Sequence, residues 1–164
     1  MSLDMFIKLL HILSAIWFTS GLLGRWFTLA QAARTPNIQS VSDFLKLSGH
    51  FEQKMVIPGW EAVFVLGLIT SWLQGWPLLG FFQGANSNWL LVAVLLFLSQ
   101  IPLIIFVFLP RGRIFGRALD QAIAQGQVTS ELSDAFRDKS VYASHVYELV
   151  STLVVIVLMV AKPF

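Results

Sequence analysis

The sequence predicts an all-α integral membrane protein: a transmembrane antiparallel four-helix bundle with short cytoplasmic loop helices. Of the 164 residues, 56% are hydrophobic and only 12% are charged, and a soluble domain of this size cannot bury that much apolar surface in one core. The apolar residues also gather into four long runs, while most charged residues lie between the runs. Because backbone groups in lipid must bond within their own segment, each run is expected to be a helix.

Four segments reach the roughly 20 apolar residues that a helix needs to cross the hydrocarbon core. The predicted spans cover residues 5–27, 55–76, 89–109 and 141–161 of a single membrane domain, residues 1–164. The first run starts near Met1, without a basic cluster before it or a small-residue cleavage site after it. We therefore expect a retained span and not a signal peptide.

Prolines and loop sequences refine these elements. Pro58 is expected in the first turns of the second span, where a missing N–H costs least, and Pro102 predicts a kink inside the third span. Both long loops are expected to be partly helical. We expect one short helix in the first loop, capped by Ser42 or Asp43 and ending at Phe51, and another over residues 113–125, ended by Gly126, in the second loop.

Nine of the eleven lysine and arginine residues lie on one side of the predicted bundle, and Lys8 and Lys162 lie on the other. The two long loops and their edges carry Arg25, Arg34, Lys46, Lys54, Arg111, Arg113, Arg117, Arg137 and Lys139, whereas the connection over residues 77–88 carries no charge. The positive-inside rule therefore places both long loops in the cytoplasm and both chain ends outside it. The basic residues flank membrane spans, so we expect the lipid bilayer as the partner and no nucleic acid.

Three arginines stand close together after the third span: Arg111, Arg113 and Arg117. Such a group is suited to holding anionic lipid headgroups. The alternative is ordinary positive charge that stops the chain from crossing the membrane.

His11 lies six residues into the first span, about 9 Å below the outer surface at the rise of an α-helix. One interpretation makes it an axial ligand to haem or to a metal, and the other makes it a hydrogen-bonded packing residue. His145 is expected in the inner half of the fourth span, well over 10 Å from the level of His11. The two histidines therefore cannot ligate one haem iron from opposite faces.

Four ionisable residues are expected in one layer of the inner half. His145 and Glu148 share a face of the fourth span, and Arg25 and Glu61 lie at a comparable depth in the first and second spans. Charges at this depth are costly, so we predict a buried polar cluster in which Arg25 neutralises a carboxylate. It is either an ion-pair network that fastens helices, a proton relay or a metal site. The paired Glu-x-x-His motifs of di-iron bundles are absent, and we assign no metal ligand.

The first span reads KLLHILSAIW over residues 8–17, Gly21 follows it, and the chain ends with LMVAKP over residues 158–163. These segments resemble a group of four-span bacterial membrane proteins of unknown function. That group is similar in layout to the HemJ-type membrane protoporphyrinogen oxidases and to the membrane part of CopD-type copper-resistance proteins. The resemblance implies a bacterial plasma membrane protein in which His11, matching the first-span histidine of the HemJ type, ligates haem b.

The leading functional hypothesis is a small redox or haem-related membrane protein that uses His11. A non-catalytic accessory or assembly subunit of a larger membrane complex is the alternative. A third hypothesis is a proton or solute path through the layer of Glu61 and Glu148, which four spans would support as a homo-oligomer. The sequence identifies no reaction, so it does not decide whether the protein is an enzyme.

Overall fold

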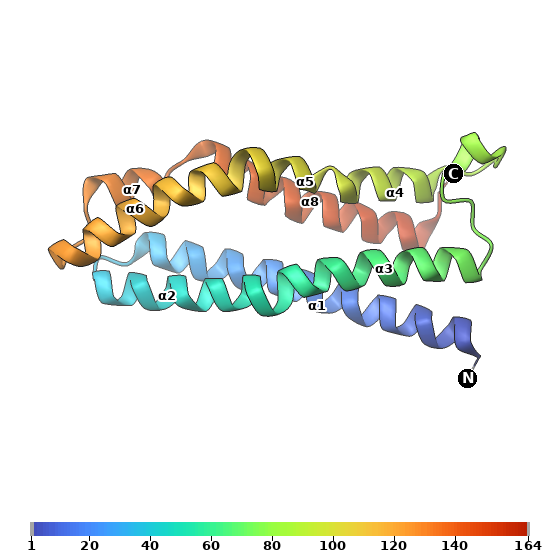
Figure 1. Cartoon of the computed structure of the whole chain (residues 1–164), viewed down its shortest axis with the longest axis horizontal. Helices are drawn as coiled ribbons and strands as arrows, with labels where there is room; N and C mark the ends of the chain where they lie inside the picture. The colour runs from blue at the N-terminus through green and yellow to red at the C-terminus, as the bar shows by residue number, and fades with distance from the viewer. Residues whose placement is uncertain (1, 164) are drawn as a thin grey trace.

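The computed structural model describes residues 2–163, and every regular element in that range is helical. Four helical rods run side by side in alternating directions (Figure 1). The rods that are long and apolar enough to cross a membrane cover Leu3–Arg34, Ile38–Leu73, Trp89–Gln125 and Ser130–Ala161. The prediction of an all-α four-helix bundle is therefore confirmed.

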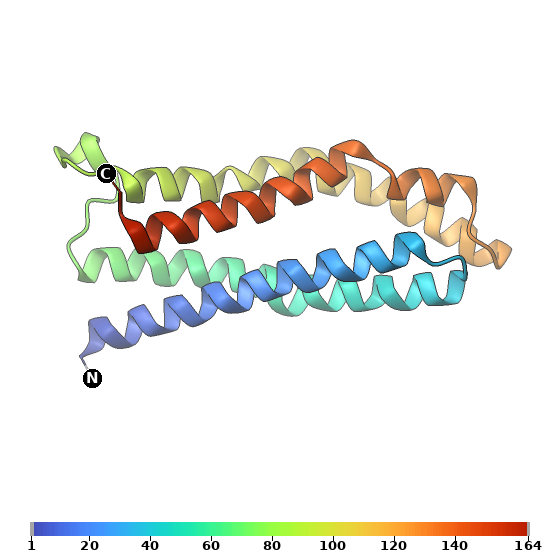
Figure 2. The same ribbon diagram turned by 180° about the vertical axis from the view of Figure 1, so that it is seen from behind.

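The elements follow one another as two hairpins. In chain order they are α1 (Leu3–Arg34), α2 (Ile38–Phe51), the π-helical turn η1 (Glu52–Val56), α3 (Ile57–Leu73), the 3₁₀ turn η2 (Gly80–Gln83), α4 (Trp89–Leu98), α5 (Gln100–Leu103), the π-helical turn η3 (Ile104–Phe108), α6 (Leu109–Gln125), α7 (Ser130–Phe136) and α8 (Lys139–Ala161). Helix α1 packs along α2 and α3, and α4 packs along α8. Both chain ends lie at the same end of the bundle in Figures 1 and 2.

The opposite end of the bundle, with the connections over residues 35–37 and 126–129, is called the basic end here. A rod of 36 residues such as Ile38–Leu73 is about 54 Å long, whereas the hydrocarbon core is about 30 Å thick. The rods therefore project beyond the membrane. At the basic end they enclose an apolar core of their own, made of Ala32, Val41, Ala118, Ala122 and Leu132.

The helices of the basic end continue the spans, and their predicted ends at Phe51 and before Gly126 are confirmed. Helix α2 begins after Asn37, whose side chain accepts hydrogen bonds from two backbone N–H groups, and not at the predicted caps Ser42 or Asp43. It then runs through η1 into α3 without a break. Helix α6 likewise continues from η3, and it ends before Gly126, which has the left-handed backbone expected of a helix-terminating glycine.

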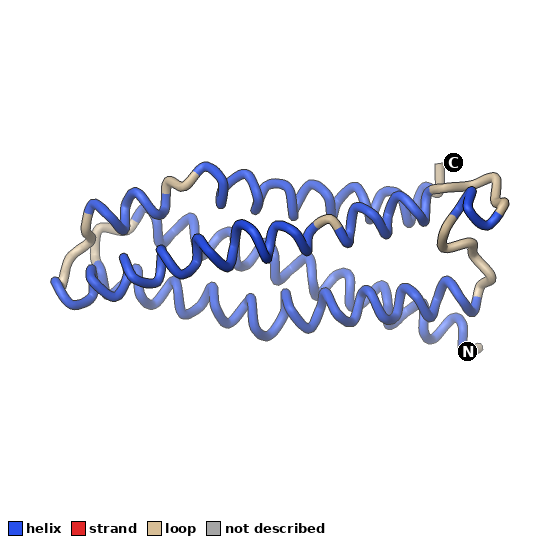
Figure 3. The backbone as a smooth tube through the Cα atoms, turned by 45° about the horizontal axis from the view of Figure 1, so that its top comes forward, coloured by secondary structure: helices blue, strands red, loops and turns tan. Residues whose placement is uncertain are grey.

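Prolines explain the irregular turns. Pro58 and Pro110 each follow a π-helical turn by two residues. A proline inside a helix lacks an N–H and clashes with the carbonyl four residues earlier, so we attribute the wider turns η1 and η3 to relief of this clash. Pro58 lies in the first turn of α3, as predicted, although α3 itself continues the longer rod that begins at Ile38. The third rod is interrupted at Ser99, three residues before Pro102, and Figure 3 shows the break as a short loop.

Glycines fix how closely the first hairpin packs. A Cβ atom on Gly21 would lie 2.7 Å from the Cβ atom of Met55, and one on Gly59 would lie 2.9 Å from the Cα atom of Phe18. Side chains at these positions would force the helices apart, as expected for small residues between membrane helices. The contacts set the register of α1 against the second rod.

Candidate functional site

Arg25 is the centre of a buried group of charged side chains. It comes from α1 and is only 8% exposed. Its Nη1 atom donates to Oε2 of Glu52 at 2.5 Å, and its Nη2 atom donates to Oε2 of Glu148. Nη2 also lies 3.2 Å from Nδ1 of His145. These four residues, Arg25, Glu52, His145 and Glu148, are called the charged cluster below.

The cluster brings three rods together. His145 and Glu148 stand one turn apart on α8, and Nδ1 of His145 lies 3.3 Å from Oε2 of Glu148. Glu148 and Thr152 are both 5% exposed, so this face of α8 points into the bundle, as expected for the face that His145 and Glu148 share. Glu52 is the first residue of the π-helical turn η1 and comes from the second rod.

Glu61 does not belong to the cluster, which corrects the sequence prediction. Its side chain is exposed, and none of the ion pairs among residues 2–163 includes it. It lies nine residues beyond Glu52, which is about 13 Å along a helix. The register set by the glycine contacts brings Glu52, and not Glu61, to the level of Arg25.

The hydropathy-based prediction left Glu52 outside the membrane spans, because the predicted second span began only at Met55. The tight connection over residues 35–37 carried part of the missing information. Arg25 lies 11 residues before Pro36, so an antiparallel hairpin that turns there places the level of Arg25 near residue 47, within α2. That reasoning excludes Glu61 but does not distinguish Glu52 from Asp43.

The Nδ1 atom of His145 stands between two groups with opposite demands. An arginine guanidinium can only donate hydrogen bonds, and an ionised carboxylate can only accept them. Nδ1 therefore either accepts from Arg25, with the imidazole proton on Nε2, or carries the proton itself and donates it to Glu148. Among residues 2–163, Nε2 of His145 makes no hydrogen bond, and this atom is not fully buried.

Aromatic rings surround the cluster. The Phe108 ring, at the end of the π-helical turn η3, lies 4.7 Å from the His145 ring. Trp60, Phe64 and Phe97 stack on one another, with ring centroids 5.0 to 6.2 Å apart. These three rings form an aromatic layer on the side of the cluster nearer the chain ends. Both π-helical turns thus supply a cluster contact, and such turns are frequent at functional sites.

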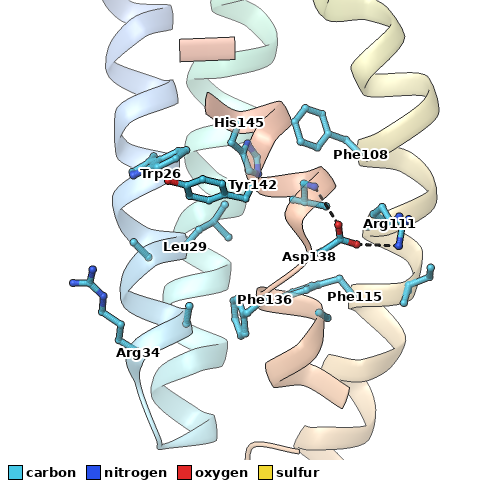
Figure 4. Close-up of a pocket in the computed structure, with 16 residues that line it drawn as sticks. Trp26, Leu29, Arg34, Phe108, Arg111, Phe115, Phe136, Asp138, Tyr142 and His145 are labelled. Carbon is cyan, nitrogen blue, oxygen red and sulfur yellow. Dashed lines mark hydrogen bonds and ion pairs between the residues drawn. The ribbon is translucent and has the colours of Figure 1, made fainter. Parts of the chain in front are cut away.

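Two cavities meet at His145. The first, called the aromatic cavity, has a volume of about 530 Å³ and lies between α1, α6, α7 and α8 (Figure 4). The second, called the charged cavity, has a volume of about 580 Å³ and is lined by all four residues of the charged cluster and by Glu61. His145 lines both cavities. Its ring is therefore placed to connect a molecule in the aromatic cavity with the buried charges.

His11 lies far from this site. It precedes Arg25 by 14 residues on α1, which is about 21 Å along the helix. Its ring packs against α3, where a Cβ atom on Gly67 would lie 3.0 Å from Cε1. The Nδ1 atom is buried without a hydrogen-bond partner. As expected, His11 and His145 occupy different levels of the bundle.

The three arginines that follow the third span have different surroundings. Arg111 forms an ion pair of 3.0 Å with Asp138, which also caps the start of α8. The sequence did not reveal this pair. Arg113 and Arg117 are exposed, and headgroup binding by this group stays a prediction.

Comparison with known proteins identifies the family. The family described as "Predicted integral membrane protein (DUF2269)" matches residues 5–163. The search of curated proteins and the search of solved structures each found no match. The family match spans nearly the whole chain and agrees with four helices able to cross a membrane. The chain therefore belongs to this family of predicted integral membrane proteins.

Proposed function

We propose that this membrane protein takes up and releases a proton at the charged cluster, with His145 and Glu148 as the exchanging groups. The observation that carries the proposal is the position of His145 Nδ1, 3.2 Å from an obligatory donor and 3.3 Å from a carboxylate oxygen. A small displacement of the ring decides whether Nδ1 accepts a hydrogen bond from Arg25 or donates one to Glu148. When the partner changes, the imidazole proton moves from one ring nitrogen to the other by exchange with a neighbouring group.

The charge balance supports proton uptake. With both carboxylates ionised and His145 neutral, Arg25 leaves the cluster with one net negative charge. One added proton makes the cluster neutral. The cluster can therefore accept one proton without becoming positively charged, whereas a bare Arg–Glu pair is already neutral.

The charged cavity gives the cluster access from the basic end. It extends toward Ser48 and Gly49 there, and its lining continues past the cluster to Trp60 and Glu61. The lysine and arginine bias favours a cytoplasmic basic end. We accordingly propose a multi-pass protein of the bacterial plasma membrane with both chain ends outside the cytoplasm, whose cluster exchanges protons with the cytoplasm.

Histidine NMR tests this function directly. Isotope-labelled histidine reports three side chains, since the chain has three histidines, and single substitutions of His11 and His50 assign the signal of His145. Between about pH 5 and about pH 8, where histidine roles commonly switch, we expect the His145 signal to report proton gain and loss. The variant Glu148→Gln should change its tautomer balance.

Glu61→Gln is the matched control, because Glu61 lines the same cavity without contacting the imidazole. We expect the His145 signal of this variant to follow the wild type. A His145 that keeps one tautomer throughout the pH range, in both the wild type and Glu148→Gln, would show a static ion-pair network and refute the proposed function.

Haem binding through His11 is a second, separate proposal, favoured by the buried Nδ1 atom that has no partner. The residues do not fit a haem in the arrangement described, since the nitrogen edge of the ring lies against Gly67 and leaves no space for a porphyrin. Ligation would require the ring to turn away from α3. We derive no step through a haem.

Absorption spectroscopy decides the haem proposal. Protein purified with haem supplementation should show a Soret band that His11→Ala abolishes or shifts, while His50→Ala, at an exposed position, should leave it unchanged. Protein that stays colourless would contradict haem binding. Stable co-purification with a partner and tolerance of His11→Ala would instead support the accessory-subunit alternative.

A further inference from the structure

We propose that the aromatic cavity binds an uncharged quinone, whose carbonyl oxygen accepts a hydrogen bond from Nε2 of His145. This inference names the ligand class of the proposed proton-exchange site and rests on that function for its proton linkage. The binding itself rests on the walls, charges and free donors of the cavity.

The walls suit a flat ring. Five aromatic side chains from α1, η3, α6, α7 and α8 line the cavity, namely Trp26, Phe108, Phe115, Phe136 and Tyr142. Figure 4 shows Trp26, Tyr142 and Phe108 grouped around His145. Aromatic faces favour offset or edge contacts with another ring, and the volume of about 530 Å³ falls in the range of about 300–1,000 Å³ usual for small-molecule sites.

The charges of the cavity favour a neutral ligand. Arg111 lines it, but its charge is compensated by Asp138 at 3.0 Å. Arg34 also lines it at the basic end, and Figure 4 shows this side chain turned away from the aromatic rings. An anionic lipid headgroup would find no free cation among the rings, whereas an uncharged ring system meets no electrostatic penalty.

Two donors are left for carbonyl oxygens. Nε2 of His145 has no partner among residues 2–163, and its proton is present whenever Nδ1 accepts from Arg25. Tyr142 lines the same cavity, and its hydroxyl likewise makes no hydrogen bond within the described chain. A quinone has two carbonyl acceptors and no donor. Its binding therefore selects the tautomer with the proton on Nε2, and this couples the ligand to Glu148.

The cavity is open at the outer surface of the bundle. Ile114 and Tyr142 both line it and are 56% and 62% exposed. Its lining lies where the predicted first, third and fourth spans reach the basic end, so an apolar ring can enter without crossing the packed core.

Titration of menadione, a small quinone, into the purified full-length protein in detergent tests the proposal. Calorimetry should show saturable binding. The matched variants are Gly112→Trp and Gly116→Trp: both glycines lie on α6 and have open space around the Cβ position, but only Gly112 lines the cavity. We expect Gly112→Trp to weaken binding at least about tenfold, which is about 1.4 kcal/mol, and Gly116→Trp to leave it unchanged.

A milder variant keeps the test decisive if Gly112→Trp fails to fold. Tyr142→Phe removes only the hydroxyl and should weaken menadione binding several-fold. Absence of saturable binding in the wild type, or equal affinity in all variants, would overturn the proposal. Phosphatidylglycerol that binds in place of menadione and is lost in Gly112→Trp would also overturn it, in favour of a lipid site.

The two proposals fail separately. If menadione binds, Gly112→Trp blocks it, and the His145 NMR signal responds to menadione but not to pH, the quinone site stands and the proton function fails. If His145 exchanges its proton but menadione does not bind, the proton function stands and the quinone site fails.

Discussion

Replacing Arg25 with leucine should be among the most damaging single changes in the chain. The substitution leaves two carboxylates without their shared cation. The Glu148 side chain is only 7% exposed, whereas Glu52 is 36% exposed, so most of the cost comes from Glu148. Removing one partner of a buried ion pair typically costs about 3–5 kcal/mol, and we expect Arg25→Leu to lower the free energy of unfolding by about this amount.

Arg111→Leu is the matched control, because Arg111 also pairs with a carboxylate. Its side chain is 49% exposed and that of Asp138 is 18% exposed. An ion pair this accessible contributes about 1 kcal/mol or less. The two arginines therefore separate the effect of burial from the effect of losing a positive charge.

The measurement is reversible unfolding in mixed micelles, followed by circular dichroism as a denaturing detergent is added. The double variant Arg25→Leu/Glu148→Leu removes the stranded charge together with the cation. It should be more stable than Arg25→Leu alone, with an interaction free energy of about 1–3 kcal/mol. A loss of less than about 1 kcal/mol in Arg25→Leu, or strict additivity in the double variant, would refute the account of the cluster as a buried charge network.

Three further changes test other parts of the fold. Gly59→Leu should destabilise the protein by about 1–3 kcal/mol through overpacking against α1, whereas Gly116→Leu, where a Cβ atom meets nothing within 4 Å, should have little effect; both are read from the same unfolding titration. Deleting the exposed residue Gln53 should turn η1 into regular helix and rotate Glu52 by about 100° relative to α3, away from Arg25. Adding Glu52→Gln to the deletion variant should then cause no further loss in the free energy of unfolding. Gln100→Leu, which removes the donor to two hydroxyls of α8, should cost about 1 kcal/mol.

The membrane fold was predictable because hydropathy and helix length act on whole segments. Long apolar runs leave the backbone no alternative to helix in lipid, and the polar stripe of α8 identifies its inward face through helical spacing alone. His145 and Glu148 could therefore be placed together before any coordinates were known. Arg25 followed from its depth, since a charge near the end of a span needs a nearby partner.

The choice of Glu52 over Glu61 depended on information that a hydropathy window does not contain. The register of a helical hairpin is set by the close contacts of Gly21 and Gly59, and the helical phase at Glu52 is set by the π-helical turn. In a regular helix, the position of a residue in the sequence would predict both its depth and the direction in which its side chain points. The extra residue in a π-helical turn changes which side chain faces α1, and the composition of residues 52–56 does not predict such a turn.

The two π-helical turns connect the proline positions with the chemistry of the site. Pro58 and Pro110 cannot make the usual helical hydrogen bond, and a wider turn precedes each of them. The first of these turns begins with Glu52 and the second ends with Phe108, and these two residues contact Arg25 and His145 respectively. The same local distortion that accommodates each proline therefore shapes one wall of the cavities. Through the wider turns that precede them, Pro58 and Pro110 therefore position a charge and a ring beside the cavities.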